Sequence, residues 1–518
     1  MFLNFIFFVN FFNILLQECA AARILVFIPL PFYSHQSVYK PLWNELANRG
    51  HKITLLTLNP MQPHENITQI DLSAVYTRLE KAKFFDVLSS GEQSLENVLH
   101  VFDTVLEAAD EELSHPEVKG LIAGNQSFDL VITEYYLTVG AAFAHKFQCP
   151  FIGVVSMDAA SDVHNIIGNP THPILYPALD LGFSGELNLK LRLGRTLFYL
   201  AWNAYVTYSI RPRENELIQK HFGSEFPLVE NLNKKASLLF INVNPVFHIQ
   251  RPLNAQTINV GGGLHIQPPK SLPEDIQGFL DDAQHGAIYF SLGSSIRSSQ
   301  LPGSTKSAII QTFGQLPYKF LWKYEKELND SMEVPKNVHL SNWLPQQDIL
   351  RHKNIKLFIT QGGLQSLEES LFIGVPVLVL PFYGDQISNA QMVVEHGFGL
   401  ALDRRNVTVR NFMSAILKLI TSTKYRNTAL KLGKQISDQP WTPLEKAVWW
   451  TEFAIRNPKV DFLKHPIAST LPLYQYYFLD FLFVFLALFS VVCCVIFCGF
   501  VVYVHLLGRC GRTKVKMD

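Results

Sequence analysis

The stretch from Trp343 to Gln386 constrains the fold of this chain more than any other part of the sequence. Within it, Leu357–Thr360 is a short apolar run bounded by turn residues, which is typical of a buried parallel strand. Gly362 and Gly363 follow, and glycine lets backbone N–H groups approach a ligand closely. The stretch therefore predicts a strand that ends in a glycine turn beside a ligand.

A helix and a second strand are predicted to follow this turn. Ser366, with Glu369 three residues later, resembles a capping box, so we expect the helix to open there and to end at Gly374. Val375–Leu380 is the next buried strand, and Asp385–Gln386 lies just past its carboxyl end. Ligands bind at that end of the strands in an open α/β sheet, and a glycine turn before a helix N-terminus suits an anion.

The same stretch resembles the nucleotide-sugar signature of the UDP-glycosyltransferases, the family that includes the glucuronosyltransferases. Spacing and residue type both match, at Trp343, Gln346, His352, Gly363, Gln365, Ser366, Glu369, Pro376, Pro381, Asp385 and Gln386. A glycine pair before a helix would be a weak signal by itself, whereas the whole run is hard to obtain by chance. The resemblance implies the GT-B fold, an α/β architecture of two Rossmann-like, doubly wound domains. The run Gln361–Ser366 looks most like insect members.

The start of the chain reads independently as the opening of a doubly wound sheet. Arg23–Leu30 is an apolar strand, a helix is predicted after the loop Pro29–His35, and Ile53–Leu58 is the next strand. Phe128–Thr133 and Pro150–Val155 are later strands of the same kind. These elements predict a parallel sheet in the first half of the chain.

Linker composition separates the two halves. Three glycines at 261–263 precede Pro268, Pro269 and Pro273, and a second βαβ series starts at Ala287. With the roles that the resemblance implies, the predicted parts are a signal peptide (1–22), an N-terminal acceptor-binding domain (23–262), a linker (263–286), a C-terminal UDP-sugar-binding domain (287–475), a transmembrane helix (481–504) and a basic cytosolic tail (505–518). An aromatic helix at Trp441–Ile455 is expected to close the second domain.

Two apolar segments predict the membrane topology. Phe2–Leu16 precedes the small residues Cys19–Ala22 and reads as a secretory signal; a membrane anchor is the alternative, although the run is short for a span. Phe481–Val504 has no charge and is long enough to cross a hydrocarbon core of ~30 Å, and basic residues follow it. The positive-inside rule then predicts a type I, single-pass protein with lumenal catalytic domains.

The lumenal part is expected to keep a single cysteine, Cys149, so we expect neither a disulfide framework nor a metal cluster. Lys514 and Lys516, fifth and third from the end, resemble a dilysine-type retrieval signal for the endoplasmic reticulum; a plain basic flank is the alternative. Sequons that permit glycosylation occur at Asn66, Asn125, Asn329 and Asn406.

Composition narrows the possible partners. The 44 basic and 44 acidic residues balance to a formal charge of zero, so nucleic acid is not an expected partner. Gly185–Ile210 mixes leucines and aromatic residues with scattered basic ones; it predicts helices packed on the domain core or, alternatively, a segment on a membrane surface. A nicotinamide dehydrogenase is disfavoured because no Gly-x-Gly-x-x-Gly follows the first strand. The sequence leaves a homo-oligomer open.

The resemblance implies a donor site in the second half. Trp343 would stack on uracil, a type of contact worth ~1–3 kcal/mol in other systems. Gln346 would bond the uracil edge or nearby backbone, and Glu369 would accept from both ribose hydroxyls. The helix N-terminus and a second loop would hold the diphosphate. The predicted donor set is Gly293, Ser294, Ser295, Trp343, Gln346, Gln361, Gly362, Gly363, Gln365, Ser366, Glu369, Asp385 and Gln386, with the last two on the hexose hydroxyls.

Two positions in this set depart from the family pattern. Gln361 stands where histidine is commonest, so it offers only a neutral N–H donor beside the leaving diphosphate. Gln365 stands where many members have asparagine, and its side chain is one methylene longer.

The acceptor side depends on His35, which follows the first strand at the catalytic edge of the sheet. A neutral imidazole there can take the proton of an attacking hydroxyl, and a carboxylate on its other nitrogen would fix the tautomer. The family has an aspartate at the position of Glu134; Asp129 in the same strand is the alternative partner.

The predicted function is an inverting transfer of a hexosyl group, glucose more than glucuronic acid, from a UDP-sugar to a hydroxyl of a small lipophilic acceptor. Neither a metal nor a further cofactor is expected, since UDP departure is assisted by a helix N-terminus. The alternative is a catalytically inactive family member that acts as a lumenal binding or partner subunit.

Overall fold

The computed structural model describes residues 21–92, 94–178, 181, 187–325, 333–465, 467 and 471–514. The described chain forms two units, one up to Lys464 and one from His465 onwards. All but the last two residues of the predicted signal peptide lie outside the described residues, as do Asn329 and Lys516.

A parallel sheet forms the first half of the larger unit, in the strand order β3-β2-β1-β4-β5-β6-β7. Its central strands β1, β4, β5 and β6 are apolar runs that are almost fully buried, as a parallel sheet requires, whereas the edge strand β3 is partly exposed. The strands of this sheet are β1 (Arg23–Phe27), β2 (Lys52–Thr57), β3 (Ile67–Asp71), β4 (Leu130–Glu134), β5 (Phe151–Val155), β6 (Leu238–Ile241) and β7 (Thr257–Asn259). The order reverses between β1 and β4, so these neighbours flank the switch point where such sheets bind ligands.

The second half repeats this plan in the order β10-β9-β8-β11-β12-β13, again with parallel pairing. Its strands are β8 (Ala287–Ser291), β9 (Lys319–Lys323), β10 (Val338–Ser341), β11 (Ile355–Thr360), β12 (Val377–Val379) and β13 (Gly399–Ala401). Here the order reverses between β8 and β11. The α/β fold of two doubly wound, Rossmann-like sheets is confirmed.

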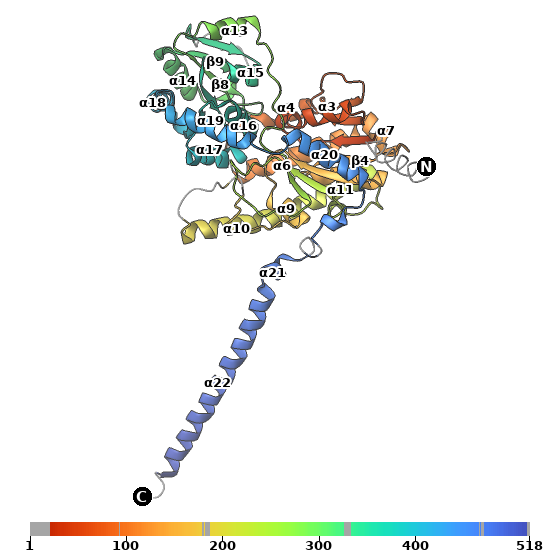
Figure 1. The fold of residues 1–518 in the computed structure, drawn as a ribbon. Coiled ribbons are helices and arrows are strands. Elements are labelled where there is room, and N and C mark those ends of the chain that lie inside the picture. The colour runs from red at the N-terminus through yellow and green to blue at the C-terminus, as the bar shows by residue number, and fades with distance from the viewer. Residues whose placement is uncertain are drawn as a thin grey trace, which may run out of the picture. The chain divides into compact units, whose positions relative to one another are not determined.

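Helices cover both faces of each sheet (Figure 1). The first half carries α2 (Tyr33–Ser37), α3 (Lys40–Asn48), α4 (Val75–Lys81), α5 (Phe84–Ser90), α6 (Leu95–Ser114), α7 (Pro116–Ala123), α8 (Ala141–Phe147), α9 (Ser161–Ile167), α10 (Leu189–Tyr205), α11 (Arg211–Phe222) and α12 (Val229–Asn233). The second half carries α13 (Glu274–Asp281), α14 (Gly303–Gln315), α15 (Gln346–Arg351), α16 (Leu364–Ile373), α17 (Asp385–His396), α18 (Val409–Thr421) and α19 (Thr423–Ser437). α13 falls inside the segment that was predicted to be a linker.

The aromatic helix expected to close the second half packs on the first half instead. α20 (Pro443–Arg456) buries Ala447, Val448 and Ala454 in one apolar cluster with the first sheet and α3. Its Glu452 accepts a hydrogen bond from Arg49 Nη1 at 3.3 Å. The chain therefore returns to the first half before this helix, where the apolar face of α20 completes the cover of the first sheet (Figure 1).

Two predicted helix starts are wrong. α16 begins at Leu364 with the extended Gly363 as N-cap and no side-chain cap, so Ser366 and Glu369 lie inside the helix and form no capping box. Their polar atoms instead contact Gln346. α2 begins at Tyr33, so His35 stands on a short helix rather than in a loop.

α10 packs on the domain core along one face and leaves a row of leucines exposed along another. Arg195 and Tyr199 are buried on one face, as packing on the core predicts. Leu189, Leu193, Leu197 and Leu200 on the other face are between 52% and 72% exposed, which is unusual for leucine. One side of the helix is thus part of the domain and the other is open.

The second unit contains α21 (Leu473–Tyr476) and α22 (Leu479–Lys514). The stretch Leu479–Leu507 is long and apolar enough to cross a membrane by length and composition. It includes the whole predicted span of 481–504, so a candidate membrane helix stands where the sequence placed one.

We predict that Gly433→Ala destabilises the protein, because α16 and α19 touch backbone to backbone at this point. A Cβ at Gly433 would lie 2.0 Å from the carbonyl oxygen of Leu371 in α16. Overpacking of this kind costs about 1–3 kcal/mol, which thermal unfolding would report as a lower Tm. Gly278→Ala in α13 is the matched control, because its Cβ would meet nothing within 4 Å. An unchanged Tm for Gly433→Ala would contradict the close approach.

Candidate functional site

A cavity of about 950 Å³ lies between the two halves of the larger unit. The segments that follow β1, β8 and β11 line it, together with α10 and α15. These segments leave the carboxyl ends of central strands in both sheets, so both switch points open into the same space.

His35 and Glu134 meet at the switch point of the first sheet. His35 follows β1, Glu134 ends the neighbouring β4, and His35 Nδ1 lies 2.5 Å from Glu134 Oε1. Glu134 is buried, while His35 lines the cavity. With Nδ1–H donated to the carboxylate, the imidazole presents Nε2 as a proton acceptor. Asp129 is no rival, because its carboxylate accepts the Arg23 backbone N–H at 2.7 Å, at the opposite end of the strands.

Trp343 of the second half also lines the cavity, and the residue is 58% exposed. The Tyr33 ring contacts it edge-on at 5.4 Å between centroids, and Lys323 Nζ lies 5.7 Å from its ring centre. The indole is therefore an open aromatic surface and not a core side chain, and a base could stack on it.

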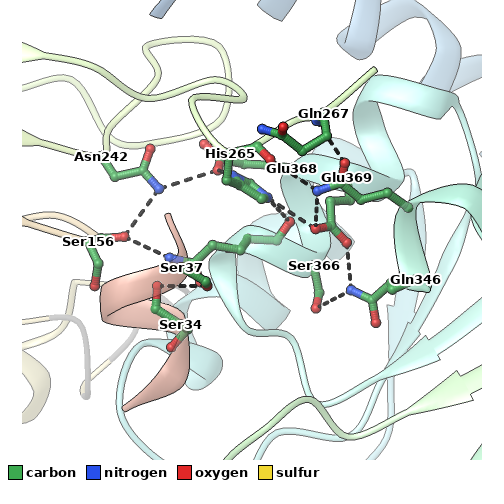
Figure 2. Close-up of polar contacts among 12 residues, drawn as sticks. Ser34, Ser37, Ser156, Asn242, His265, Gln267, Gln346, Ser366, Glu368 and Glu369 are labelled. Carbon is green, nitrogen blue, oxygen red and sulfur yellow. Dashed lines mark hydrogen bonds and ion pairs between the residues drawn. The ribbon is translucent and has the colours of Figure 1, made fainter. Parts of the chain in front are cut away.

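Glu369 is held by two glutamines of α15. Gln346 Nε2 donates to Glu369 Oε2 at 2.6 Å and also to Ser366 Oγ at 2.9 Å, and Gln347 Nε2 donates to Glu369 Oε1 at 3.0 Å (Figure 2). Glu369 lines the cavity and is only 7% exposed. The carboxylate is thus pre-oriented toward the space where a ligand would bind.

The loops after β8 and β11 touch at the switch point of the second sheet. Gly293 has φ +78°, and a Cβ there would lie 2.2 Å from Gln361 Nε2. Gly293, Ser294, Ser295, Gln361 and Gly363 all line the cavity. Gly363 caps α16 with extended backbone, so the N–H groups of the first turn face this space without a side-chain cap. A helix N-terminus with this neighbourhood suits a phosphate.

Three residues of the predicted donor set make their main contacts with the surrounding protein and not with the cavity. Gly362 does not line it: its φ is +88°, and a Cβ would meet the side chain of Val379. Gln365 reaches across to the first half, where its Nε2 donates to the Ser156 carbonyl at 3.1 Å. Gln386 lines the cavity, but its Oε1 accepts from the Phe382 N–H at 2.9 Å and so shapes the loop.

Asp385 also lines the cavity, and its Oδ2 accepts from Asn389 Nδ2 at 2.7 Å. The carboxylate is thereby fixed at the start of α17. Asp385 and Gln386 remain next to each other at the carboxyl end of β12, as the sequence predicted.

The first half supplies an apolar wall. This wall comes from α6, α10 and the loop after β4, with Phe102, Val105, Leu106, Tyr136, Phe198 and Trp202. At its edge Asp158 Oδ2 pairs with Arg251 Nη2 at 3.2 Å. Burial opposes the charge of Asp158, but Arg251 and His164 outweigh it and hold its pKa well below the ordinary value. The wall thus combines a large apolar surface with the Asp158–Arg251 ion pair and with Arg195 of α10, which also lines the cavity.

Sequence reasoning missed three residues that line the cavity. Lys323 ends β9 and donates to the Gly293 carbonyl at 2.9 Å, and His265 lies beside Glu369. Gln347, which follows Gln346 on α15, was not predicted as a site residue. A lysine that ends an otherwise apolar strand was a usable signal for Lys323, whereas nothing local distinguished His265.

Within the described parts of the chain, no group of three or more His, Cys, Asp or Glu side chains is arranged to hold a metal ion. The polar groups around the cavity are instead amides, hydroxyls, basic side chains (among them Lys323 and Arg251) and the carboxylates described above.

A family model described as "UDP-glucoronosyl and UDP-glucosyl transferase" matches residues 23–517. UDP-glucosyltransferase 2 of Dactylopius coccus is 31% identical over 492 residues, which cover 94% of each chain. The ecdysteroid UDP-glucosyltransferase of Spodoptera littoralis nuclear polyhedrosis virus is 30% identical over 463 residues, 85% of this chain and 89% of the viral one.

Solved glycosyltransferase structures share the fold. The spinosyn forosaminyltransferase SpnP superposes with a TM-score of 0.57, and the calicheamicin glycosyltransferase CalG4 with 0.53. Each is 17% identical; the matches cover 84% and 85% of this chain and 100% of the neighbours. At this identity the likeness speaks for the architecture alone, which is GT-B.

Proposed function

The chain belongs to the UDP-glycosyltransferase family, and on that premise we propose that it transfers glucose from UDP-glucose to a hydroxyl of a small lipophilic acceptor, with inversion at the anomeric carbon. That the protein is a UDP-glycosyltransferase follows from family membership. The sugar, the acceptor and the mechanism are our proposal.

The observation that carries the mechanism is the His35–Glu134 pair, whose imidazole lines the same cavity as Trp343 and Glu369. The acceptor hydroxyl would donate its proton to His35 Nε2 while its oxygen bonds to the anomeric carbon. The bond from that carbon to the UDP oxygen breaks at the same time, and UDP leaves with the electron pair. Glu134 stabilises the imidazolium that forms. Attack from the face opposite the leaving group inverts the configuration.

The second half offers the groups that a UDP-sugar needs. Trp343 would stack on uracil, and Glu369 would accept from the ribose hydroxyls. The first turn of α16 would bind the diphosphate, with Lys323 close by at the Gly293 loop. These donors would stabilise departing UDP, so we propose that neither a metal nor a further cofactor takes part.

Two features support the proposed substrates. The apolar wall of α6 and α10 fits a lipophilic acceptor, since it would bury apolar surface of that molecule. Relatives from Dactylopius coccus and from nuclear polyhedrosis viruses are named UDP-glucosyltransferases, which favours glucose over glucuronic acid. Conjugation of this kind makes lipophilic molecules more polar, so we propose a role in detoxification.

His35→Ala should lower kcat by about 10²–10⁴-fold, because a general base of this type contributes that much. Glu134→Gln should also lower kcat, because the imidazolium loses its carboxylate. Calorimetric titration with UDP should give wild-type affinity for both variants. Transfer by His35→Ala at the wild-type rate would exclude His35 as the base. UDP binding without transfer by the wild-type protein, over a panel of phenols and flavonoids, would favour the inactive-subunit alternative.

Trp343→Ala should weaken UDP binding by about 5- to 150-fold, which corresponds to the loss of ~1–3 kcal/mol of stacking. Trp343→Phe should recover most of the affinity because it keeps an aromatic face. Trp449→Ala is the control, since Trp449 is a similarly exposed tryptophan on α20 that does not line the cavity. Equal affinities for Trp343→Ala and Trp449→Ala would place uracil elsewhere.

We further propose that the protein is a single-pass type I protein of the endoplasmic reticulum membrane with its catalytic halves in the lumen. The candidate span Leu479–Leu507 and the basic residues after it support this topology. In microsomes the protein should resist extraction by alkaline carbonate, and deletion from residue 479 onwards should release it. Digestion of the catalytic halves by protease added outside intact microsomes would contradict a lumenal site.

A further inference from the structure

His265 is buried between two carboxylates at the second switch point. It lies on the segment that joins the two halves, and its side chain is only 7% exposed. Its Nε2 lies 3.3 Å from Glu369 Oε1, and its Nδ1 lies 3.6 Å from Glu368 Oε2 (Figure 2). Glu368 and Glu369 are consecutive residues of α16. The imidazole therefore separates two carboxylates that would otherwise repel each other.

Both ring nitrogens of His265 face oxygen atoms. Besides Glu369, Nε2 has the Gln365 carbonyl oxygen at 3.2 Å. At 3.6 Å the Nδ1 atom makes no hydrogen bond with Glu368, but a neutral imidazole would turn its lone pair toward that carboxylate, whereas an imidazolium places positive charge beside both carboxylates. Glu368 also accepts the Gly262 N–H at 2.9 Å and Asn242 Nδ2 at 3.3 Å. Both carboxylates lie within ion-pair distance of the ring, so the geometry favours a protonated His265.

We propose that protonated His265 is a positioning residue for the donor: its imidazolium holds the Glu369 carboxylate in place at the cavity, so that both carboxylate oxygens can accept from ribose hydroxyls. This inference rests on the proposed function. Without the imidazolium, the two adjacent buried carboxylates would repel each other, and Glu369 would lose the cation that lies beside its Oε1.

The charged groups around His265 agree with this assignment. Burial opposes the charge on the imidazole, but the hydrogen bond with Glu369 and the charges of Glu369 and Glu368 outweigh burial and raise the pKa of His265. Burial raises the pKa of Glu368. Two tyrosines of the first half lie near these carboxylates. Burial, and then the charge of Glu369, raise the pKa of Tyr33. Burial, and then the charges of Glu134 and Glu368, raise the pKa of Tyr39, so both phenols stay neutral. Asn242 and Gln347, which also pack here, carry no charge.

The same contacts connect the donor site to the joint between the halves. Gln347 Nε2 donates to the His265 carbonyl at 3.2 Å and to Glu369 Oε1 at 3.0 Å. Glu368 holds Gly262, three residues before His265. A purely structural role for His265 would act on stability, whereas a positioning role acts on nucleotide affinity and on its pH dependence.

The test is calorimetric titration of the full-length protein with UDP from about pH 6 to about pH 9, a range that brackets a histidine pKa raised from 6.5. For His265→Gln we expect affinity about tenfold weaker at neutral pH, as for loss of a charge-assisted contact. In the wild type, affinity should fall as pH rises through the raised pKa of His265, because the imidazolium is lost there. His265→Gln should lack this fall. Ionisation of UDP itself affects both proteins equally, so it cancels in the ratio of their UDP affinities at each pH.

Kinetics and control variants separate the effect of the His265 charge on donor binding from a structural effect of the substitution. For UDP-glucose, His265→Gln should raise KM about tenfold and leave kcat nearly unchanged. His51→Gln is the matched control, because His51 is buried 3.6 Å from Glu452 and far from the cavity lining. Gln347→Leu removes a neutral donor to Glu369 and should weaken UDP binding while it keeps the fall at high pH.

The inference is overturned if wild type and His265→Gln bind UDP with the same affinity and the same pH dependence. If His265→Gln does not fold, the pH dependence of UDP affinity in the wild type and in Gln347→Leu is the test. The inference is equally overturned if both affinities stay constant through this pH range. A wild-type protein that binds no UDP at any pH would instead refute the proposed function, and the inference with it.

Discussion

Each sheet changes its winding direction once, between β1 and β4 in the first half and between β8 and β11 in the second. At such a point the segments that leave neighbouring strands turn to opposite faces of the sheet and leave a gap. His35 and Glu134 occupy the first gap, and the Gly293 and Gln361 loops occupy the second. Both gaps open into one cavity. The position of the chemistry is therefore set by strand order, and side chains decide only what happens there.

Two histidine–carboxylate pairs border the cavity, and a different member of each pair is the one available to a ligand. In His35–Glu134 the carboxylate is deeply buried and the imidazole faces the cavity, so the ring is the group that can exchange a proton with a ligand. In His265–Glu369 both groups border the cavity, but the imidazole has carboxylates within ion-pair distance of both nitrogens. There the carboxylate is the group that offers free acceptor capacity to a ligand. In the function that we propose, the same two residue types would serve as a base in one half and as an anchor in the other.

Much of the fold could be predicted from sequence, because apolar runs bounded by turn residues are a local signal. β1, β4, β5 and β11 all lie within a few residues of their predicted bounds. The capping box at Ser366 was a wrong inference from a local pattern. Gly363 is the N-cap of the helix, and the Ser366 hydroxyl accepts a hydrogen bond from Gln346 Nε2 instead. Local patterns show that a polar side chain needs a partner but do not say which one.

Contacts between distant segments were beyond that kind of reading. An amphipathic helix at 443–456 shows that it has an apolar face, and the pattern cannot say which sheet that face covers. His265 stands in a glycine- and proline-rich segment without periodicity, so its place beside Glu369 follows only from the packing of the two halves. Gln365 likewise looked like a ligand-facing amide, yet it binds the Ser156 carbonyl of the first half.

The position of α20 also bears on how the protein is made. Residues such as Ile24 and Val26 of β1 share an apolar cluster with Ala447 and Val448. During translation this face of the first sheet stays uncovered until the ribosome has finished the second half, on the order of ten seconds or longer at ~5–20 residues per second. The amino-terminal half therefore cannot bury this apolar face by itself while it is being made. A chain that stops before α20 leaves the same face of the first sheet exposed to solvent.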